Sequence, residues 1–173
     1  DNPRTIYCGT FSKTLSPGLR MGWICGAAPV IRKLVLMKQA SDLHSPTINQ
    51  AVMHDVALRH YDSHTAMLRD AYRRRRDLLL QALERHMPEG TSWTKPEGGM
   101  FVWVTLPEGM DGGALLARAI ETEHVAFVPG QAFHADGSGA NTIRLSFSLA
   151  DETAAEEGMT RLGRLIRREA SGR

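Results

Sequence analysis

The sequence contains little cysteine and few aromatic residues, with two cysteines and 6% aromatics in 173 residues. Cys8 and Cys25 lie in apolar runs without a C-x-x-C spacing, and two thiols are too few for a disulfide framework. We therefore expect both thiols to be reduced and buried. Reduced cysteines are typical of the cytoplasm, which is the compartment that the sequence favours.

Long hydrophobic runs and a strong charge bias are also absent. No apolar stretch reaches the roughly 18 residues that a membrane-spanning helix needs, and Asp1–Arg4 does not resemble the start of a secretion signal. The formal net charge is +2, and 42% of the residues are hydrophobic. This composition excludes a disordered chain and a polycation built for nucleic acid, and it predicts a globular protein without a membrane partner.

The seven histidines show no metal-ligand spacing on one helix face, so we predict no metal site. His60 and His64 are four residues apart, but a helix break expected near Asp62 would separate them. The consecutive arginines Arg73–Arg76 should point in different directions from a helix. We expect them to form a solvated face and not an anion site.

A lysine set among potential anion-binding side chains is the most informative feature. Within Gly9–Trp23, Thr10 and Ser12 stand just before Lys13, and Arg20 follows seven residues after it. A lysine amine can form a Schiff base with a carbonyl cofactor, while hydroxyls and a forked guanidinium hold phosphate. Together they suggest pyridoxal 5′-phosphate. The alternative is ordinary turn chemistry around a solvated lysine, with the Ser12 hydroxyl capping the turn.

Arg144 is a second candidate, because it lies in an apolar segment, Thr142–Phe147, that is expected to form a strand. Burial of a guanidinium is costly unless an anion pairs with it. That anion is either an internal carboxylate, which would make Arg144 a structural residue, or a carboxylate ligand. The residues alone leave both open.

The segment Gly9–Trp23 resembles the S-x-S-K-x-x-x-P-G-x-R-x-G-W segment of fold-type I PLP-dependent aminotransferases of class I/II. The similarity is to the branch with the 2-aminoadipate and kynurenine aminotransferases. Two later stretches are similar to the same family in the right order, Pro96–Val104 and Val128–Gly130 followed by Asn141–Ser148. Members of that family are normally much longer, so we expect this chain to be a C-terminal portion of one.

The resemblance implies a role for each candidate residue. Lys13 would be the catalytic lysine that carries the cofactor, and Thr10 and Arg20 would bind its phosphate, with Ser12 as a weaker candidate. Arg144 would form a bidentate pair with the substrate α-carboxylate.

The expected fold class is α/β and α+β: the C-terminal end of a PLP-transferase large domain, made of strands and helices, followed by a small α+β C-terminal domain. Residues 1–62 would be the remnant of the large domain, 63–88 a long interdomain helix that starts at Asp62 or Ser63, and 89–173 the small domain. In the small domain the patterns predict strands over 91–94, 100–106, 125–128 and 142–147, a helix over 112–123, and a final helix capped by Asp151.

The resemblance implies that the parent protein moves an amino group from an α-amino acid to a 2-oxo acid, and that it is a homodimer. The chain alone should be inactive, since the family's aspartate, tyrosine and asparagine around the cofactor ring lie upstream of the lysine. The alternative is the aminotransferase-like effector domain of a winged-helix (GntR/MocR-type) transcription regulator. A nucleic-acid partner is expected only if an upstream DNA-binding domain exists. A non-catalytic interaction module is the last alternative.

Overall fold

The computed structural model describes residues 4–149 and 151–172, so the outer limits of the predicted domains, at residues 1 and 173, lie outside the described residues. The chain divides into two compact units, Asp1–Asp70 and Ala71–Arg173, here called unit 1 and unit 2. The division falls inside one long helix, α2. Each unit is described by itself.

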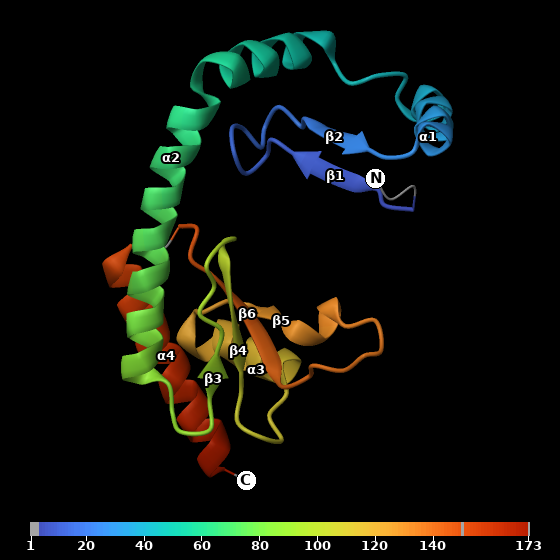
Figure 1. Ribbon diagram of the computed structural model, residues 1–173. Helices are drawn as coiled ribbons and strands as arrows, with labels where there is room; N and C mark the ends of the chain where they lie inside the picture. Colours follow the sequence, from blue (N-terminus) through green and yellow to red (C-terminus); the bar gives the residue numbers. More distant parts are fainter. Residues whose placement is uncertain (1–3, 150, 173) are drawn as a thin grey trace. The chain divides into compact units, whose positions relative to one another are not determined.

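Unit 1 is a hairpin followed by helices (Figure 1). Strands β1 and β2 pair antiparallel, with Thr10 opposite Gly22. Pro29 in the first turn of α1 needs no hydrogen-bond acceptor, which explains why that helix starts there. The elements are β1 (Tyr7–Thr10), β2 (Gly22–Cys25), α1 (Ala28–Ser41) and the first part of α2 (Thr47–His86).

The expected helix break near Asp62 is wrong, because α2 continues from Thr47 to His86. No glycine or proline interrupts this range. The hydroxyl of Ser63 donates to the carbonyl of His60 at 3.2 Å, and that of Thr65 donates to Asp62 at 3.1 Å. Hydroxyls that bond backward along the helix sit in its interior, so these residues do not cap a new helix.

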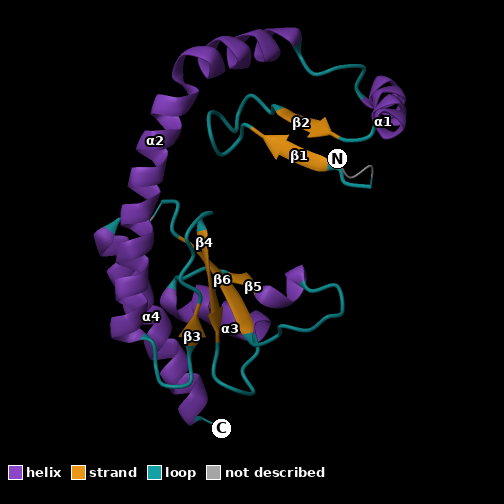
Figure 2. Ribbon diagram, viewed as in Figure 1, coloured by secondary structure: helices purple, strands orange, loops and turns teal. Residues whose placement is uncertain are grey.

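Unit 2 contains a four-stranded antiparallel sheet in the order β3-β4-β6-β5. The C-terminal part of α2 and the helix α4 lie beside this sheet (Figure 2). The final helix begins as predicted, because the Asp151 side chain accepts a hydrogen bond from the Ala154 N–H. The elements are β3 (Ser92–Trp93), β4 (Phe101–Thr105), α3 (Gly112–Arg118), a π-helix (Ala119–Glu123), β5 (Val128–Pro129), a 3-10 helix (Gly130–Phe133), β6 (Thr142–Ser146) and α4 (Glu152–Ser171).

One face of this sheet carries the core. Alternate residues of β4 and β6 point to one side and are buried, as strand geometry requires. They pack against the buried stripe of α4 and the last turns of α2. The shared core includes Leu79, Leu83, Val102, Val104, Ile143, Leu145, Leu162, Leu165 and Ile166. Thr142, Arg144 and Ser146 therefore belong to the opposite face of the sheet.

Two further expectations need correction. Cys8 and Cys25 are free thiols but are exposed, because they lie on the β1–β2 hairpin, which no buried apolar cluster of the described chain covers. The arginine run is only partly solvated: Arg75 donates to the Ser148 carbonyl, and Arg76 donates to the Pro96 carbonyl at 3.1 Å. These two side chains connect α2 to loops of unit 2 and so have a structural role.

Candidate functional site

The Lys13 loop joins the two strands of the hairpin and is closed by backbone hydrogen bonds. The Phe11 N–H donates to the Met21 carbonyl at 3.1 Å, and the Leu15 and Ser16 N–H groups both donate to the Phe11 carbonyl. These bonds fold residues 11–16 into a tight turn in which Lys13 is exposed. The turn thus presents the lysine amine to solvent at the end of two strands.

Thr10 and Ser12 form a pair of neighbouring hydroxyls beside that lysine. The two oxygens, Thr10 Oγ1 and Ser12 Oγ, lie 3.0 Å apart, and the Ser12 N–H donates to Thr10 Oγ1 at 3.1 Å. The same threonine hydroxyl lies 3.2 Å from the Met21 carbonyl. Hydroxyl groups can rotate to donate or accept, so this pair can turn its hydrogens toward an anion.

Arg20 lies in a left-handed backbone conformation, with φ of 53°, which is uncommon for a residue with a side chain. One guanidinium nitrogen, Nη1, donates to the Pro17 carbonyl at 3.0 Å, and no carboxylate among the described residues pairs with it. Asn49 of α2 fixes the neighbouring backbone, since its Nδ2 donates to the Leu19 carbonyl at 3.2 Å. No local pattern in the sequence indicates that Asn49 contacts this loop.

Gly9 has a steric role in the hairpin. A Cβ built on Gly9 would lie 2.3 Å from the indole ring of Trp23, directly across the strand pair. Only glycine fits there unless the indole moves. The glycine therefore allows Trp23 to pack across the strand that ends at Thr10.

Arg144 lies on the face of the sheet away from the core, where its guanidinium contacts two aromatic rings. Its Cζ is over the Phe101 ring at 4.0 Å from the centroid and over the Phe133 ring at 4.4 Å. Its Nε is buried without a hydrogen-bond partner, and none of the described acidic side chains forms an ion pair with it. Arg144 thus forms no salt bridge with any described residue.

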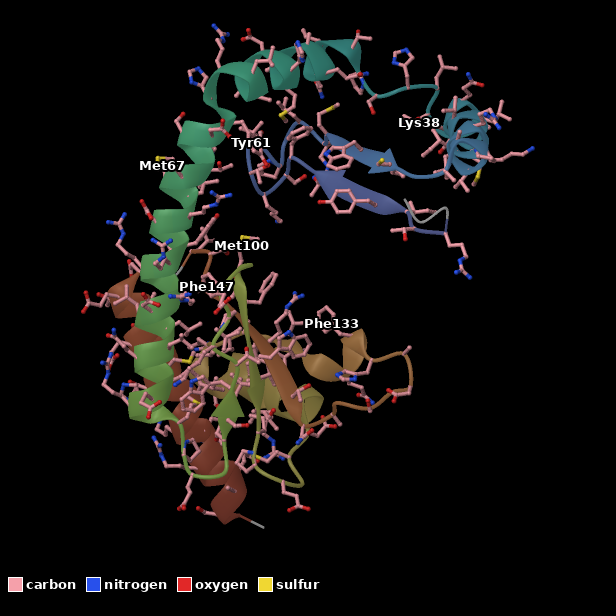
Figure 3. All side chains as sticks on the ribbon, viewed as in Figure 1. Lys38, Tyr61, Met67, Met100, Phe133 and Phe147 are labelled. Atoms are coloured by element: carbon pink, nitrogen blue, oxygen red, sulfur yellow. The ribbon has the colours of Figure 1, made fainter. Side chains whose placement is uncertain are left out.

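Phe133 is held by the segment that follows β5. Its ring meets the Trp103 ring edge to face, with centroids 5.3 Å apart and an angle of 82°, and Figure 3 shows it beside the sheet of unit 2. Gly130 starts the same short helix, and a Cβ there would lie 1.8 Å from Thr142 Oγ1 and 2.9 Å from the Trp103 ring. The absence of a side chain at Gly130 lets this segment lie directly on the sheet.

Four of the five predicted site residues lie on the β1–β2 hairpin and its connecting loop in unit 1: Thr10, Ser12, Lys13 and Arg20. Arg144 lies in unit 2. Phe101 and Phe133 were not foreseen as site residues. Strand alternation places Phe101 on the face of Arg144 only once the β4–β6 register is known, and no sequence pattern indicates where Phe133 lies.

Comparison with known proteins assigns the chain to a family. Residues 1–162 match the family described as aminotransferase class I and II. The chain is 47% identical over 167 residues to aromatic-amino-acid aminotransferase 1 of Thermococcus litoralis, covering 96% of this chain and 40% of that protein. The chain belongs to the class I and II aminotransferase family, as the sequence segments predicted.

A solved structure agrees with this assignment. The α-aminoadipate aminotransferase of Thermus thermophilus, solved with N-(5′-phosphopyridoxyl)-L-leucine, is similar with a TM-score of 0.93 and 42% identity. The similarity covers 99% of this chain and 44% of that one. The predicted fold class, the C-terminal part of a fold-type I architecture, is confirmed.

Regulators are related as well. An uncharacterised HTH-type transcriptional regulator of Bacillus subtilis is 36% identical over 171 residues, which is 98% of this chain and 35% of the regulator. The chain thus spans about two fifths of the length of the aminotransferase relative and less of the regulator. In the part of the chain that the structure describes, no helix combines the length and apolar character needed to cross a membrane.

Proposed function

We propose that the whole protein carrying this chain is an aminotransferase that binds pyridoxal 5′-phosphate and moves an amino group from an α-amino acid to a 2-oxo acid. The observation that carries the proposal is Arg144, a half-buried guanidinium with a buried, unpartnered Nε and no acidic partner among the described residues. Burying a guanidinium without an anion is costly, so this environment favours an anionic ligand. Both substrates of amino-group transfer carry a carboxylate next to the reacting carbon.

The Lys13 loop fits the cofactor by the chemistry of its donors. Two rotatable hydroxyls 3.0 Å apart, on Thr10 and Ser12, and the guanidinium of Arg20 supply donors for a phosphate. Lys13 is exposed beside them and supplies an amine for the cofactor's aldehyde. When bound, the cofactor supplies an electron-withdrawing ring that makes the substrate's α-hydrogen acidic.

The chain's own residues then have separate tasks. Thr10, Ser12 and Arg20 hold the phosphate and so fix the cofactor in place. Arg144 binds the substrate carboxylate through two parallel N–H donors and so orients the α-carbon. The Lys13 amine would accept the proton from that α-carbon and pass it to the cofactor's C4′ carbon, acting as base and then as acid.

We extend the proposal to the assembly and the compartment. A cytoplasmic homodimer accords with the family resemblance and with two free cysteines. The chain alone would not transaminate, since it spans about two fifths of a relative's length. The alternative, that this chain is the effector domain of a transcription regulator, has less support. The chain is 36% identical to the Bacillus subtilis regulator but 47% identical to the Thermococcus litoralis aminotransferase.

The test is the substitution Arg144→Ala in the whole protein, with each half-reaction followed in a single turnover. For amino acids, kcat/KM should fall by roughly two to four orders of magnitude, since two charge-assisted hydrogen bonds are lost. For the matching amines, which lack the carboxylate, it should change little. Arg118→Ala, at an exposed arginine paired with Glu169, is the matched control and should leave both unchanged. Equal losses for amino acids and amines would refute the assignment of Arg144.

A further inference from the structure

We infer that Phe101 and Phe133 are positioning residues that hold the guanidinium plane of Arg144 between their rings and leave only its edge open to a planar carboxylate. This inference rests on the proposed function, since it concerns the same carboxylate site. It adds two residues that never touch the reacting atoms, and it predicts which feature of these residues matters, namely the aromatic face.

The contacts of Arg144 support this role. Both rings lie within the roughly 6 Å over which a cation is attracted to an aromatic face, at 4.0 Å for Phe101 and 4.4 Å for Phe133. The Nε atom, which could have fixed the side chain through a hydrogen bond, has no partner in the described chain. With Nε unpartnered, the two ring contacts are the interactions that we infer hold the guanidinium in place.

The geometry of a guanidinium explains the consequence. Its five N–H bonds lie in the plane of the group, so a ligand must approach at the edge of that plane. Two rings that cover the faces of the guanidinium would leave the in-plane donors free and would block rotation out of the plane. A guanidinium held in this way favours a planar carboxylate, because the two carboxylate oxygens can accept two parallel hydrogen bonds from its N–H groups.

Each ring is itself fixed by the fold. Phe101 is in β4 opposite Ser146, two residues along β6 from Arg144, so it reaches the arginine diagonally across the sheet. Phe133 is the last residue of the short helix that begins at Gly130. The absence of a side chain at Gly130 lets this helix lie close to Trp103, and the Phe133 ring contacts the Trp103 ring. We call Phe101 and Phe133 the aromatic clamp of Arg144. Because the clamp already restricts the side chain, Arg144 loses less conformational entropy when a ligand binds, and binding is tighter.

Phe133 is the better of the two for testing, because it is 49% exposed and a substitution there should not unfold the protein. Phe133→Leu removes the aromatic face but keeps an apolar side chain, whereas Phe133→Tyr keeps the face. In the whole protein, the apparent dissociation constant for amino acids in the half-reaction should rise roughly 3- to 30-fold in Phe133→Leu, the range of a lost cation–π contact. The rate at saturation should hold, and Phe133→Tyr should restore binding.

The NMR signal of the Arg144 Nε–H group tests, without any catalytic turnover, whether the two phenyl rings lie over the guanidinium. In the whole protein labelled with [¹⁵N]arginine, the Nε–H signal of Arg144, identified by its loss in Arg144→Lys, should be displaced by the ring currents of both phenyl groups. Phe133→Leu should reduce that displacement, and Phe133→Tyr should retain it. An unchanged signal in Phe133→Leu would show that the ring does not lie over the guanidinium and would overturn the inference.

The outcomes separate this inference from the proposed function. If Arg144→Ala distinguishes amino acids from amines but Phe133→Leu binds amino acids as well as the unsubstituted protein does, the inference fails and the function stands. If Arg144→Ala shows no such distinction, the carboxylate assignment fails whatever the spectra show. Loss in Phe133→Leu that Phe133→Tyr does not restore would mean that the side chain supports the fold and does not position Arg144.

Discussion

Unit 1 and unit 2 bury very different amounts of apolar surface, although they belong to one chain. Met53 and Thr65 are the only buried residues among those described in unit 1. All the other buried hydrophobic residues of the described chain lie in unit 2, around its sheet. Unit 1 leaves large apolar side chains exposed, among them Tyr7 at 61% and Leu58 at 75%.

The difference separates two ways of holding a functional residue. Lys13 is positioned by turn hydrogen bonds and by a hairpin that has no core of its own in the described chain. Arg144 is positioned by a strand whose neighbours Ile143 and Leu145 are buried in a core. Rigidity at Arg144 thus follows from packing, whereas the Lys13 loop depends on local geometry.

The largest expected effect is at Lys13. In the whole protein, Lys13→Ala should abolish the visible absorption of the bound cofactor, since the covalent link is lost. Reduction with borohydride followed by peptide mapping checks the assignment in the unsubstituted protein. Lys33 and Lys38 of α1 are the internal comparison, and a pyridoxyl label on either of them in place of Lys13 would refute it.

The next largest effect follows from the contrast in packing between the two units. It compares the free energy of unfolding after substitution of two leucines of α2, one buried and one exposed. Leu83→Ala in unit 2 should lower the free energy of unfolding by about 2–5 kcal/mol, because it leaves a cavity at a fully buried site. Leu58→Ala in unit 1, the matched control on α2, should change it by less than about 0.5 kcal/mol in this chain. Denaturant unfolding of the 173-residue chain measures both. Similar losses would show that Leu58 is packed as well.

Arg20 should have a smaller and more graded effect. Arg20→Ala should weaken retention of the cofactor during dialysis of the whole protein more than Arg20→Lys does, since lysine keeps the charge but not the forked donors. A retention time that falls in the order arginine, lysine, alanine is the expected result. If the two variants retain the cofactor as long as the unsubstituted protein does, Arg20 serves only the turn through its bond to Pro17.

The smallest effect is at Glu156 in unit 2, which bonds to Arg85 and to His86, each at 2.5 Å. The hydrogen bond from Arg85, and then that from His86, lowers the pKa of Glu156 to about 2. A carboxylate with a lowered pKa stabilises the fold above its unfolded-state pKa of about 4.5, and this contribution disappears as the pH falls toward about 2.

Glu156→Gln should therefore be less stable than the unsubstituted chain at pH 6, and the difference should shrink as the pH falls below about 4.5. Unfolding by denaturant at several pH values measures it. Glu121→Gln, at an exposed glutamate in the same unit, is the control. A difference that does not change between pH 6 and pH 2.5 would mean that the pair with Arg85 and His86 has no part in acid stability.

Much of the fold was predictable from local patterns. The Asp151 cap predicted the last helix. The structure buries its apolar stripe, Ala155, Met159, Leu162 and Ile166. The strand at Thr142 was found from its apolar alternation. The break near Asp62 was predicted wrongly because aspartate and serine favour helix starts, but nothing in their side chains forces one, and Ser63 bonds backward instead.

The sequence by itself determined the family and the Lys13 loop, because the lysine, the hydroxyls and Arg20 lie within a few residues of one another and their chemistry is local. The tertiary structure decided what surrounds Arg144. The residues alone left both a salt bridge and a carboxylate ligand open for it. Only the pairing of β4 with β6, and the close approach of Gly130 to the sheet, bring Phe101 and Phe133 to its guanidinium. These contacts depend on strand register and packing, which no local pattern encodes.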